Sequence, residues 1–546
     1  MEKSIKHIIF ILILAMMVLP FIQGYLTFVT EKPLYGVPEK SRPALFSMDS
    51  WMNGSYQEAQ NIRTEEKLGF HSSLVRLYYQ IDFSLFGKPY AKGITKGMNG
   101  QYYETDYIRS WTGEDFVGEK QLDHRLRQFR FLQQHLKDSL DIDLVLVLEP
   151  GKATVYPEDI PTRFTKAEPG ASNYDYICVR ADELDIKLID FNAYFKKLKD
   201  TSQYPVFPKK GTHWSEFAMW YAADSLVNYI ESVRGIDLPE IVMEGREISD
   251  SLRSSDNDIE RTLNLLFKQK HQAMPYPVYS FREDSSHTKP EVLVVADSYY
   301  WNIFNTRIPK YLFAHEAFWY YYGKIYPDTY YVAKKDSAVT VKDINIQKEI
   351  EKQDVIFLMI TERFLYKFDR GFIWDLYNLY GKTSSRDELT PYLNSIVLTD
   401  NWFADLIIQA KEDRLSLSNK MDLHARYMYM VDHPDQYYAC YGPRVMFREI
   451  KENEAWYLSA RKNAIRKDIS IDEQLVEEAR FAIQDKHPEG LIRYDQFTAI
   501  KDSIRHDSAW YASVMDQAKH YFMTEEEIMQ AEAERVWDTM VVRDSL

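Results

Sequence analysis

The sequence predicts an α/β domain with a mostly parallel sheet, followed by an all-α module and preceded by one transmembrane helix. Three observations lead to this prediction. Between about residues 90 and 370, four short runs rich in Val, Ile and Leu alternate with helical patterns, which is typical of parallel strands connected by helices. Beyond that point no such run follows, and tryptophans recur at a fixed interval. The N-terminal stretch is apolar and long enough to cross a bilayer.

Residues 1–29 are predicted to be a membrane anchor or a signal segment. Lys3 and Lys6 precede an apolar stretch over residues 8–29. At about 1.5 Å per residue, a helix of this length nearly crosses a hydrocarbon core of roughly 30 Å. Residues 8–22 are also typical of a signal-peptide core, but Gln23-Gly24-Tyr25 fits a cleavage site poorly. We expect an uncleaved anchor in the inner (cell) membrane, with the bulk of the chain in the periplasm or outside the cell.

Residues 30–90 are predicted to form a linker and a leading helix, and residues 91–370 the α/β domain. The string FHSSLVRLYYQIDFSLFG has apolar residues at three- and four-residue spacing, which predicts a helix. Next, ITKGMNGQYY contains the turn pair Asn99-Gly100 and predicts a hairpin. A long helix is expected in LDHRLRQFRFLQQHLKDSL and another from residues 214–216 onward. The four strands are expected in DLVLVLEP, IKLIDF, EVLVVAD and DVIFLMITERF. Reactive groups in such sheets gather beyond the carboxyl ends of the strands.

Residues 392–546 are predicted to be a helical module of three repeats with a 54-residue period. Ser or Thr stands at one phase of each repeat, and twice it is followed three residues later by Glu, which predicts a capped helix. Each repeat is therefore expected to contain a Trp-bearing helix, a short turn and a capped second helix, with Trp and Ala as packing positions. The aligned columns are Trp402, Trp456 and Trp510, then Ala410, Ala464 and Ala518, then Ser416, Ser470 and Thr524, then Ala425, Ala479 and Ala533.

Composition excludes some classes of function. The net charge of -15 argues against nucleic-acid binding, which needs a basic surface. The two cysteines, Cys178 and Cys440, form neither a metal-ligand spacing nor a disulfide framework. The 40 tyrosines suit sugar-binding clefts, although half-buried packing is the commoner use of Tyr.

Ser298 and His213 are the residues that could carry chemistry. Ser298 follows the apolar run EVLVVAD, and His213 stands just before a helical pattern. A serine at the carboxyl end of a buried strand, beside a histidine from another loop, is how nucleophilic hydrolases and acyltransferases are built. Locally, Ser298 could equally be a helix cap and His213 a structural residue.

Six strings in one order over residues 45–370 resemble the SGNH-hydrolase-like domains of the AlgX/AlgJ family of polysaccharide (alginate) O-acetyltransferases. Singly none is specific, but together in this order they are. They are the segment starting SWMNGSYQEAQ, the hairpin ITKGMNGQYY, and then EPGKATVYPEDIP, GTHWS, VADSYY and ITERFL. The resemblance implies an SGNH-like fold and no metal or organic cofactor.

The resemblance also implies roles for single residues. Ser298 would be the nucleophile that carries the acyl group, and His213 would be its base. Backbone N–H groups around Ser298 would help to form an oxyanion hole. For Lys152 and Arg363 an ordinary ion pair is an equal alternative. The expected supporting residues are Asp297, Asp190 and Asn302, and the expected substrate-binding residues are Lys152, Tyr299 and Arg363.

Two positions depart from the family's pattern. The family's triad carboxylate lies two residues before the histidine, where this chain has Gly211, and the Gly that precedes Asp-Ser is Ala296. In serine proteases, loss of this carboxylate's function costs about 10⁴-fold in turnover. Either another acid serves, with Asp190 and Glu216 as candidates, or a slower Ser-His dyad operates, or the site is a degenerate copy.

The function implied by the resemblance is transfer of an acyl group, expected to be acetyl, to hydroxyls of a cell-envelope or exported polysaccharide. The implied partners are a polysaccharide acceptor, a membrane-bound O-acyltransferase as the acyl donor, and the membrane itself through the N-terminal helix. A carbohydrate esterase and a polysaccharide-binding or scaffolding protein with an inactive site are the two alternatives.

Overall fold

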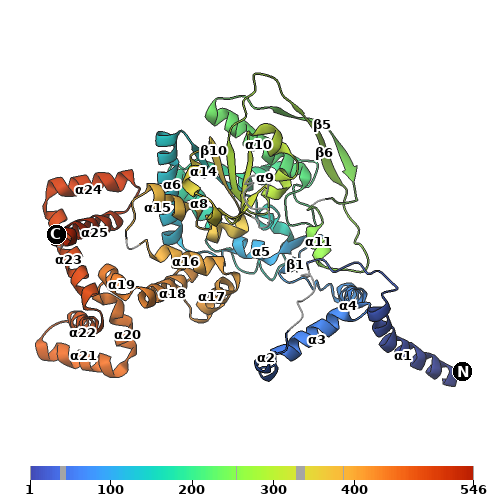
Figure 1. Ribbon diagram of the computed structural model, residues 1–546, viewed down its shortest axis with the longest axis horizontal. Coiled ribbons are helices and arrows are strands. Elements are labelled where there is room, and N and C mark those ends of the chain that lie inside the picture. The colour runs from blue at the N-terminus through green and yellow to red at the C-terminus, as the bar shows by residue number, and fades with distance from the viewer. Residues whose placement is uncertain (1, 37–44, 254, 328–338, 385–386, 545–546) are drawn as a thin grey trace.

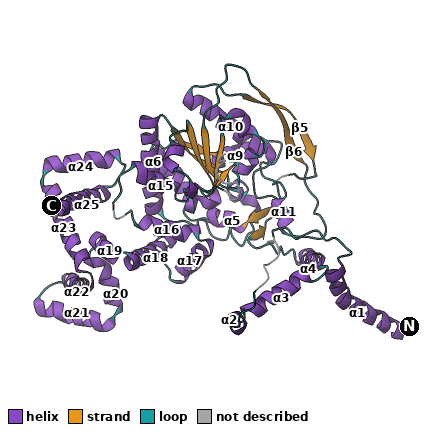
Figure 2. Ribbon diagram, in the orientation of Figure 1, coloured by secondary structure: helices purple, strands orange, loops and turns teal. Residues whose placement is uncertain are grey.

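The protein was examined as a computed structural model, which describes residues 2–36, 45–253, 255–327, 339–384 and 387–544. Residues 37–44 of the predicted linker lie outside these described residues. An N-terminal helical arm, a central α/β domain and a C-terminal helical module follow one another, and the two ends of the chain lie on opposite sides (Figure 1). The main sheet occupies the centre of the molecule (Figure 2).

The N-terminal arm contains the predicted apolar helix. This helix, α1, is the one described helix long and apolar enough to cross a membrane, over Ser4–Leu26, and a signal sequence has the same properties. The predicted leading helix is α4. The bounds of the arm's helices are α1 Glu2–Leu26, α2 Met48–Met52, α3 Ser55–Lys67 and α4 His71–Phe86.

The main sheet has six strands in the order β4-β3-β10-β7-β8-β9, and all neighbours are parallel except β8 and β9. The four predicted strands are β3, β4, β7 and β10, which stand side by side in the order β4-β3-β10-β7. Both β3 and β10 are buried along their whole length, which explains their continuous apolar sequence. The bounds are β3 Asp143–Glu149, β4 Leu188–Asp190, β7 Val292–Ala296, β8 Glu316–Tyr320, β9 Lys324–Tyr326 and β10 Val355–Thr361.

Four strands lie outside the main sheet, in two antiparallel pairs. The predicted hairpin is the pair β1 (Ile94–Lys96) and β2 (Tyr102–Glu104). The second pair, β5 (Glu240–Ser249) and β6 (Met274–Arg282), was not predicted. Strands β8 and β9 of the main sheet were not predicted either, because they are short and their side chains are largely aromatic or charged.

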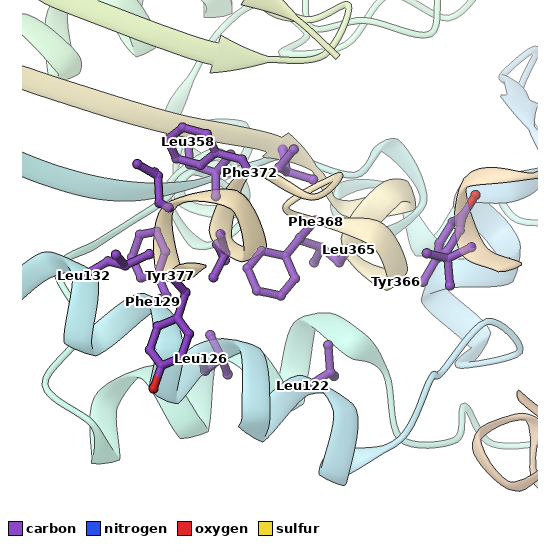
Figure 3. Packing of buried hydrophobic residues seen from close by; sticks show 14 of the residues in the cluster. Leu122, Leu126, Phe129, Leu132, Leu358, Leu365, Tyr366, Phe368, Phe372 and Tyr377 are labelled. Atoms are coloured by element: carbon purple, nitrogen blue, oxygen red, sulfur yellow. The ribbon is translucent and has the colours of Figure 1, made fainter. Parts of the chain in front are cut away.

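Helices cover both faces of the sheet, and alternate residues of each strand contact one cover or the other. On one face, α6 packs with the segment that follows β10, and Figure 3 shows Leu122, Leu126, Phe129 and Leu132 of α6 beside Phe368. The other face is covered mainly by α9, α10 and α12. The helices of the domain are α5 Thr105–Thr112, α6 Glu119–Leu140, α7 Lys152–Val155, η1 Pro157–Asp159, α8 Asn173–Glu183, α9 Phe191–Thr201, α10 Glu216–Arg234, α11 Asp258–Thr262, α12 Tyr300–Phe304, α13 Ile308–Leu312, η2 Val341–Asp343, α14 Ile346–Ile350, η3 Glu362–Lys367 and α15 Phe372–Tyr380.

The C-terminal module is helical throughout its described residues. The Ala columns of the sequence pattern are buried, and the indole N–H of Trp456 donates to Glu478 at 3.1 Å while that of Trp510 donates to Glu532 at 3.0 Å. Additional helices, α19 with α20 and then α23, stand between the predicted helix pairs. The number of repeats stays a prediction. The bounds are α16 Leu389–Leu398, α17 Asp400–Glu412, α18 Leu417–Asp432, α19 Pro434–Tyr441, η4 Pro443–Met446, α20 Phe447–Glu452, α21 Glu454–Lys467, α22 Ile471–Lys486, α23 Pro488–His506, α24 Ser508–His520 and α25 Glu525–Asp544.

The module contacts the α/β domain at both of its ends. Near its start, the ring of Phe403 on α17 stacks on Tyr366 of η3 with 4.2 Å between centroids. Near its end, Glu527 on α25 accepts a hydrogen bond from Arg127 on α6 at 2.7 Å. The module therefore leaves the α/β domain and returns to it.

Candidate active site

Ser298 lies at the carboxyl end of β7, between β10 and β8 in the sheet. The preceding Asp297 is buried and fixes this turn, because its carboxylate accepts hydrogen bonds from the N–H of Tyr299 at 3.0 Å and of Thr361 at 2.9 Å. Thr361 ends β10, so Asp297 joins the ends of two neighbouring strands. The residue at the N-cap of α12 is Tyr299 and not Ser298. The serine side chain is therefore not used as the cap of this helix.

His213 brings its ring to Ser298 from the loop before α10. Its Nε2 lies 3.0 Å from the Ser298 hydroxyl oxygen. The helix starts two residues later at the N-cap Ser215, whose side chain accepts a hydrogen bond from the N–H of Ala218. This cap fixes where α10 begins and so where the loop delivers the histidine.

Asp258 contacts the other nitrogen of the His213 ring. Its Oδ2 lies 2.6 Å from Nδ1, while its Oδ1 accepts hydrogen bonds from the N–H of Thr212 at 2.8 Å and of Ile259 at 2.7 Å. A carboxylate held this way orients the imidazole and favours the tautomer with a free Nε2 lone pair. Ser298, His213 and Asp258 thus form a continuous Ser-His-Asp arrangement.

The two sequence-based candidates for the acid lie elsewhere. Asp190 caps α9 by accepting from the N–H of Ala193, and it also accepts from the Tyr174 hydroxyl at 2.8 Å. Glu216 stands in the first turn of α10. The sequence does not indicate Asp258, because this residue is 45 positions from His213 and begins a five-residue helix that no periodic pattern marks.

Gly211 explains why the acid can come from α11. A Cβ atom at this position would lie 2.5 Å from the carbonyl oxygen of Ser255 and 3.0 Å from the carbonyl carbon of Asp256. The segment that leads to Asp258 therefore occupies the space that a side chain at residue 211 would need. The absence of a carboxylate at residue 211 and the approach of Asp258 to His213 therefore result from the same packing.

Lys152 is buried beneath the His213 loop. Its ammonium donates hydrogen bonds to the carbonyl oxygens of Pro208 at 2.7 Å, Lys209 at 3.2 Å and Gly211 at 2.7 Å. Desolvation lowers the pKa of Lys152 to about 7. The side chain holds the backbone that leads to His213, and in this structure it does not face a substrate.

Three more predicted residues are engaged within the protein. Tyr299 is buried, donates its hydroxyl to the carbonyl of Thr212 at 2.8 Å and packs its ring 4.8 Å from the His213 ring. Arg363 is buried and forms an ion pair with Glu104. The Asn302 amide donates to the Ser255 hydroxyl at 2.6 Å. These contacts support the surroundings of His213 and Asp258.

Tyr321 is a site residue that the sequence did not indicate. It lies in the turn after β8, and its N–H donates to the carbonyl of Ala296 at 2.8 Å, two residues before Ser298. Desolvation raises the pKa of its phenol, and a hydrogen bond with the Ser298 side chain acts in the opposite direction. Arg370 covers the ring at 4.0 Å. Both Tyr321 and Tyr322 have positive φ angles, 53° and 51°, which are costly for bulky residues.

A serine at the end of a parallel strand, bonded to a histidine that is bonded to an aspartate, defines the serine acyl-transfer class of α/β proteins. Residues 108–293 of the chain match the model of a family described as SGNH hydrolase-like domain, acetyltransferase AlgX. The matched range includes His213 and Asp258 and ends before Ser298. Over these residues the chain is therefore similar to SGNH hydrolase-like acetyltransferase domains, and the resemblance drawn from the sequence is confirmed.

Comparison with solved structures finds similar folds at low sequence identity. The O-acetyltransferase domain of Pseudomonas putida AlgJ is 19% identical with a TM-score of 0.35, covering 53% of this chain and 99% of that one. Pseudomonas aeruginosa AlgX is 14% identical with a TM-score of 0.29, covering 49% and 55%. Bacillus cereus PatB1 is 11% identical with a TM-score of 0.28, covering 46% and 93%. These scores are too low to support an inference alone. None of the curated proteins compared is a match.

Proposed function

We propose that this chain transfers an acetyl group to hydroxyls of a cell-envelope or exported polysaccharide, through an acyl-enzyme on Ser298. The observation that carries the proposal is the His213 ring, which bridges the Ser298 hydroxyl at 3.0 Å and the Asp258 carboxylate at 2.6 Å. This is the arrangement that makes a serine hydroxyl nucleophilic near neutral pH.

In the first half-reaction, Ser298 Oγ attacks the carbonyl carbon of the acyl donor and His213 Nε2 takes the hydroxyl proton. The positive charge on the imidazole is stabilised by Asp258. When the tetrahedral intermediate collapses, the bond to the leaving group breaks and His213 returns the proton to that group. The acetyl ester of Ser298 remains.

In the second half-reaction, the sugar hydroxyl takes the place of the leaving group. The oxygen of the sugar hydroxyl attacks the ester carbonyl while His213 Nε2 accepts the hydroxyl proton. The proton then goes to Ser298 Oγ as the bond between Oγ and the acetyl group breaks. Backbone N–H groups near Ser298 are the candidates for the oxyanion hole. The N–H of Tyr299 is already donated to Asp297 at 3.0 Å, so it is not one of these candidates.

A membrane location fits this chemistry. We propose that α1 is an uncleaved anchor that keeps the bulk of the chain in the periplasm or outside the cell. The acyl donor would then be a membrane-bound O-acyltransferase, since acyl groups used there have to cross the membrane.

An inactive copy is the alternative that Gly211 favours. Asp258 supplies the carboxylate that this position lacks, so the geometry no longer favours a pure binding or scaffolding role. An esterase would use the same three residues, with water as the acceptor.

The test is the intact mass of the full chain in detergent after incubation with an activated acetyl ester. We expect one acetyl adduct on the parent protein, none on Ser298→Ala and a slowly formed one at most on His213→Ala. Addition of a glycan acceptor should discharge the adduct with acetyl appearing on the glycan, whereas an esterase would release only acetate. A folded parent protein that forms no adduct at any pH would contradict the proposal.

A further inference from the structure

Helix α4 turns its apolar side away from the protein. The residues of this outer stripe are Leu74, Leu77, Tyr78, Ile81 and Leu85, which follow the spacing of one helix face and are 44–69% exposed. No residue of α4 is buried. In a globular protein the apolar face of a surface helix packs on the core. None of the residues that the structure describes buries this stripe.

The inner side of α4 is already occupied by the α/β domain. Phe83 packs against a cluster of Tyr102, Ile259 of α11 and Leu263. Near it, the Gln80 side chain accepts a hydrogen bond from the N–H of Phe267 at 3.0 Å. These contacts fix the rotation of the helix about its axis. The stripe therefore faces outward as a consequence of packing.

The segment just before α4 is bonded to the C-terminal part of α1. The N–H of Gly69, just before α4, donates to the carbonyl of Pro20 in α1 at 3.0 Å. Arg76 of α4 donates to the carbonyls of Lys32 and Pro33, which follow α1, at 2.8 and 2.7 Å. Figure 1 shows α1, α3 and α4 meeting at one corner of the molecule. The stripe thus begins beside the point where the chain would leave the bilayer.

We propose that α4 lies in the membrane interface with its apolar stripe in contact with lipid; this rests on the proposed role of α1 as a membrane anchor. A helix of 16 residues is about 24 Å long, and an anchor at its start keeps it within reach of the headgroup region. Tyr78 with its neighbours Tyr79 and Tyr90 forms an aromatic cluster, and tyrosines are enriched at that depth.

This contact would place the acyl-transfer site at the bilayer surface. Phe83 of α4 packs against a cluster that includes Ile259 of α11, and this helix begins with Asp258, the partner of His213. The side of the active site that carries Asp258 would then face the membrane. An acyl group delivered from within the membrane would reach the site from this side.

The experiment measures contact with lipid directly in the full chain. Single cysteines carrying an environment-sensitive fluorophore replace Leu77 or Ile81 in a Cys178→Ser, Cys440→Ala background, and the protein is reconstituted in phosphatidylcholine vesicles whose acyl chains bear a spin-label quencher. Met16→Cys in α1 reports insertion of the anchor. Phe481→Cys on α22, 78% exposed and far from α1, is the matched water-exposed control. Acetylation of Ser298 in each variant confirms that it is folded.

The expected result is blue-shifted and quenched emission at residues 77 and 81, comparable to that at residue 16, with no quenching at residue 481. Water-like emission at residues 77 and 81 beside a quenched label at residue 16 would overturn the proposal and leave the anchor intact. A blue shift without quenching would also overturn it, because a second copy of the chain would then cover the stripe. An unquenched label at residue 16 would show that α1 is not inserted in the bilayer. That result would contradict both the anchor role of α1 and the proposed position of α4.

Discussion

Asp258 decides whether the site of this chain is complete, because no carboxylate stands two residues before His213. It meets the ring from a different element and is held by two backbone N–H groups, at 2.8 and 2.7 Å. Backbone N–H groups can hold a carboxylate in place whatever the neighbouring side chains are, so no sequence motif has to surround it. The same catalytic geometry is therefore reached with the acid on another segment of the chain.

Replacement of Asp258 with Asn should cost about 10⁴-fold in the rate of Ser298 acetylation, the loss found when a serine-protease aspartate is changed in this way. The amide keeps the shape but does not stabilise the imidazolium, and it favours the wrong tautomer. Acetylation is followed by intact mass with time. Asp190→Asn is the control, since Asn also caps a helix well, and its rate should stay within about twofold. Equal rates in the two variants would disprove the role of Asp258.

Gly211→Ala should both slow acetylation and destabilise the protein, by about 1–3 kcal/mol. The new Cβ would lie 2.5 Å from the Ser255 carbonyl oxygen and push away the segment that carries Asp258. Gly245→Ala is the matched control, because nothing lies within 4 Å of a Cβ built there. Urea unfolding and the acetylation rate are the two measurements. If the two variants behave alike, Gly211 has no part in admitting Asp258.

At the scale of elements, α6 and α25 are joined by a small network of charged side chains. His124 of α6 lies 3.0 Å from both Glu527 and Asp387. Desolvation lowers the pKa of His124, but hydrogen bonds with Asp387 and Glu527 outweigh it and raise the pKa to about 9. Desolvation raises the pKa of Glu527, but His124 and Arg127 hold it well below its usual range. Both shifts favour the charged pair.

The contribution of His124 to stability should therefore depend on pH. The pKa is raised on folding from 6.5 to about 9, so the stabilisation is complete below pH 6.5 and is lost as the pH rises through about 9. We expect the difference in free energy of unfolding between the parent and His124→Gln to be largest near pH 6 and small above pH 9. Urea unfolding at both pH values measures this difference, and the control is His506→Gln, a change of an exposed histidine at the end of α23. A difference that grows with pH would contradict this assignment.

At the scale of the whole molecule, the helical module is a part of the enzyme's framework. It is attached at its start through Phe403 and Tyr366 and at its end through Glu527 and Arg127. Tyr366 belongs to η3, which directly follows β10, and the last residue of β10 donates its N–H to Asp297. A short series of contacts, through η3 and the end of β10, therefore links the module to the turn that carries Ser298.

Phe403→Ala should destabilise the protein by about 3–5 kcal/mol, the usual cost of removing a buried phenyl ring. The ring is 4% exposed and stacked on Tyr366 at 4.2 Å. Phe481→Ala removes the same atoms from an exposed site and should change stability by less than about 0.5 kcal/mol. Urea unfolding followed by tryptophan fluorescence compares the two. Similar losses would mean that the stacked contact does not hold the module.

Much of the fold could be predicted because it depends on local pattern. The continuous apolar runs predicted β3, β4, β7 and β10, since strands buried on both faces have no polar side to alternate with. The hairpin of β1 and β2 followed from Asn99-Gly100. Strands β8 and β9 gave no such signal, because they are short and carry aromatic and charged side chains.

For the site, the sequence by itself determined Ser298, His213 and the family of the domain, because these residues stand in local strings that keep their order. It could not determine Asp258 or Tyr321, or the inward positions of Lys152, Tyr299 and Arg363. Those depend on which distant segments pack together. The segment that leads to α11 packs on Gly211 and brings Asp258 to the site, and the turn after β8 packs on the end of β7 and brings Tyr321. Lys152 turns inward because backbone carbonyls surround its ammonium. A side chain's partner is set by the space and hydrogen bonds around it, and only the tertiary structure provides them.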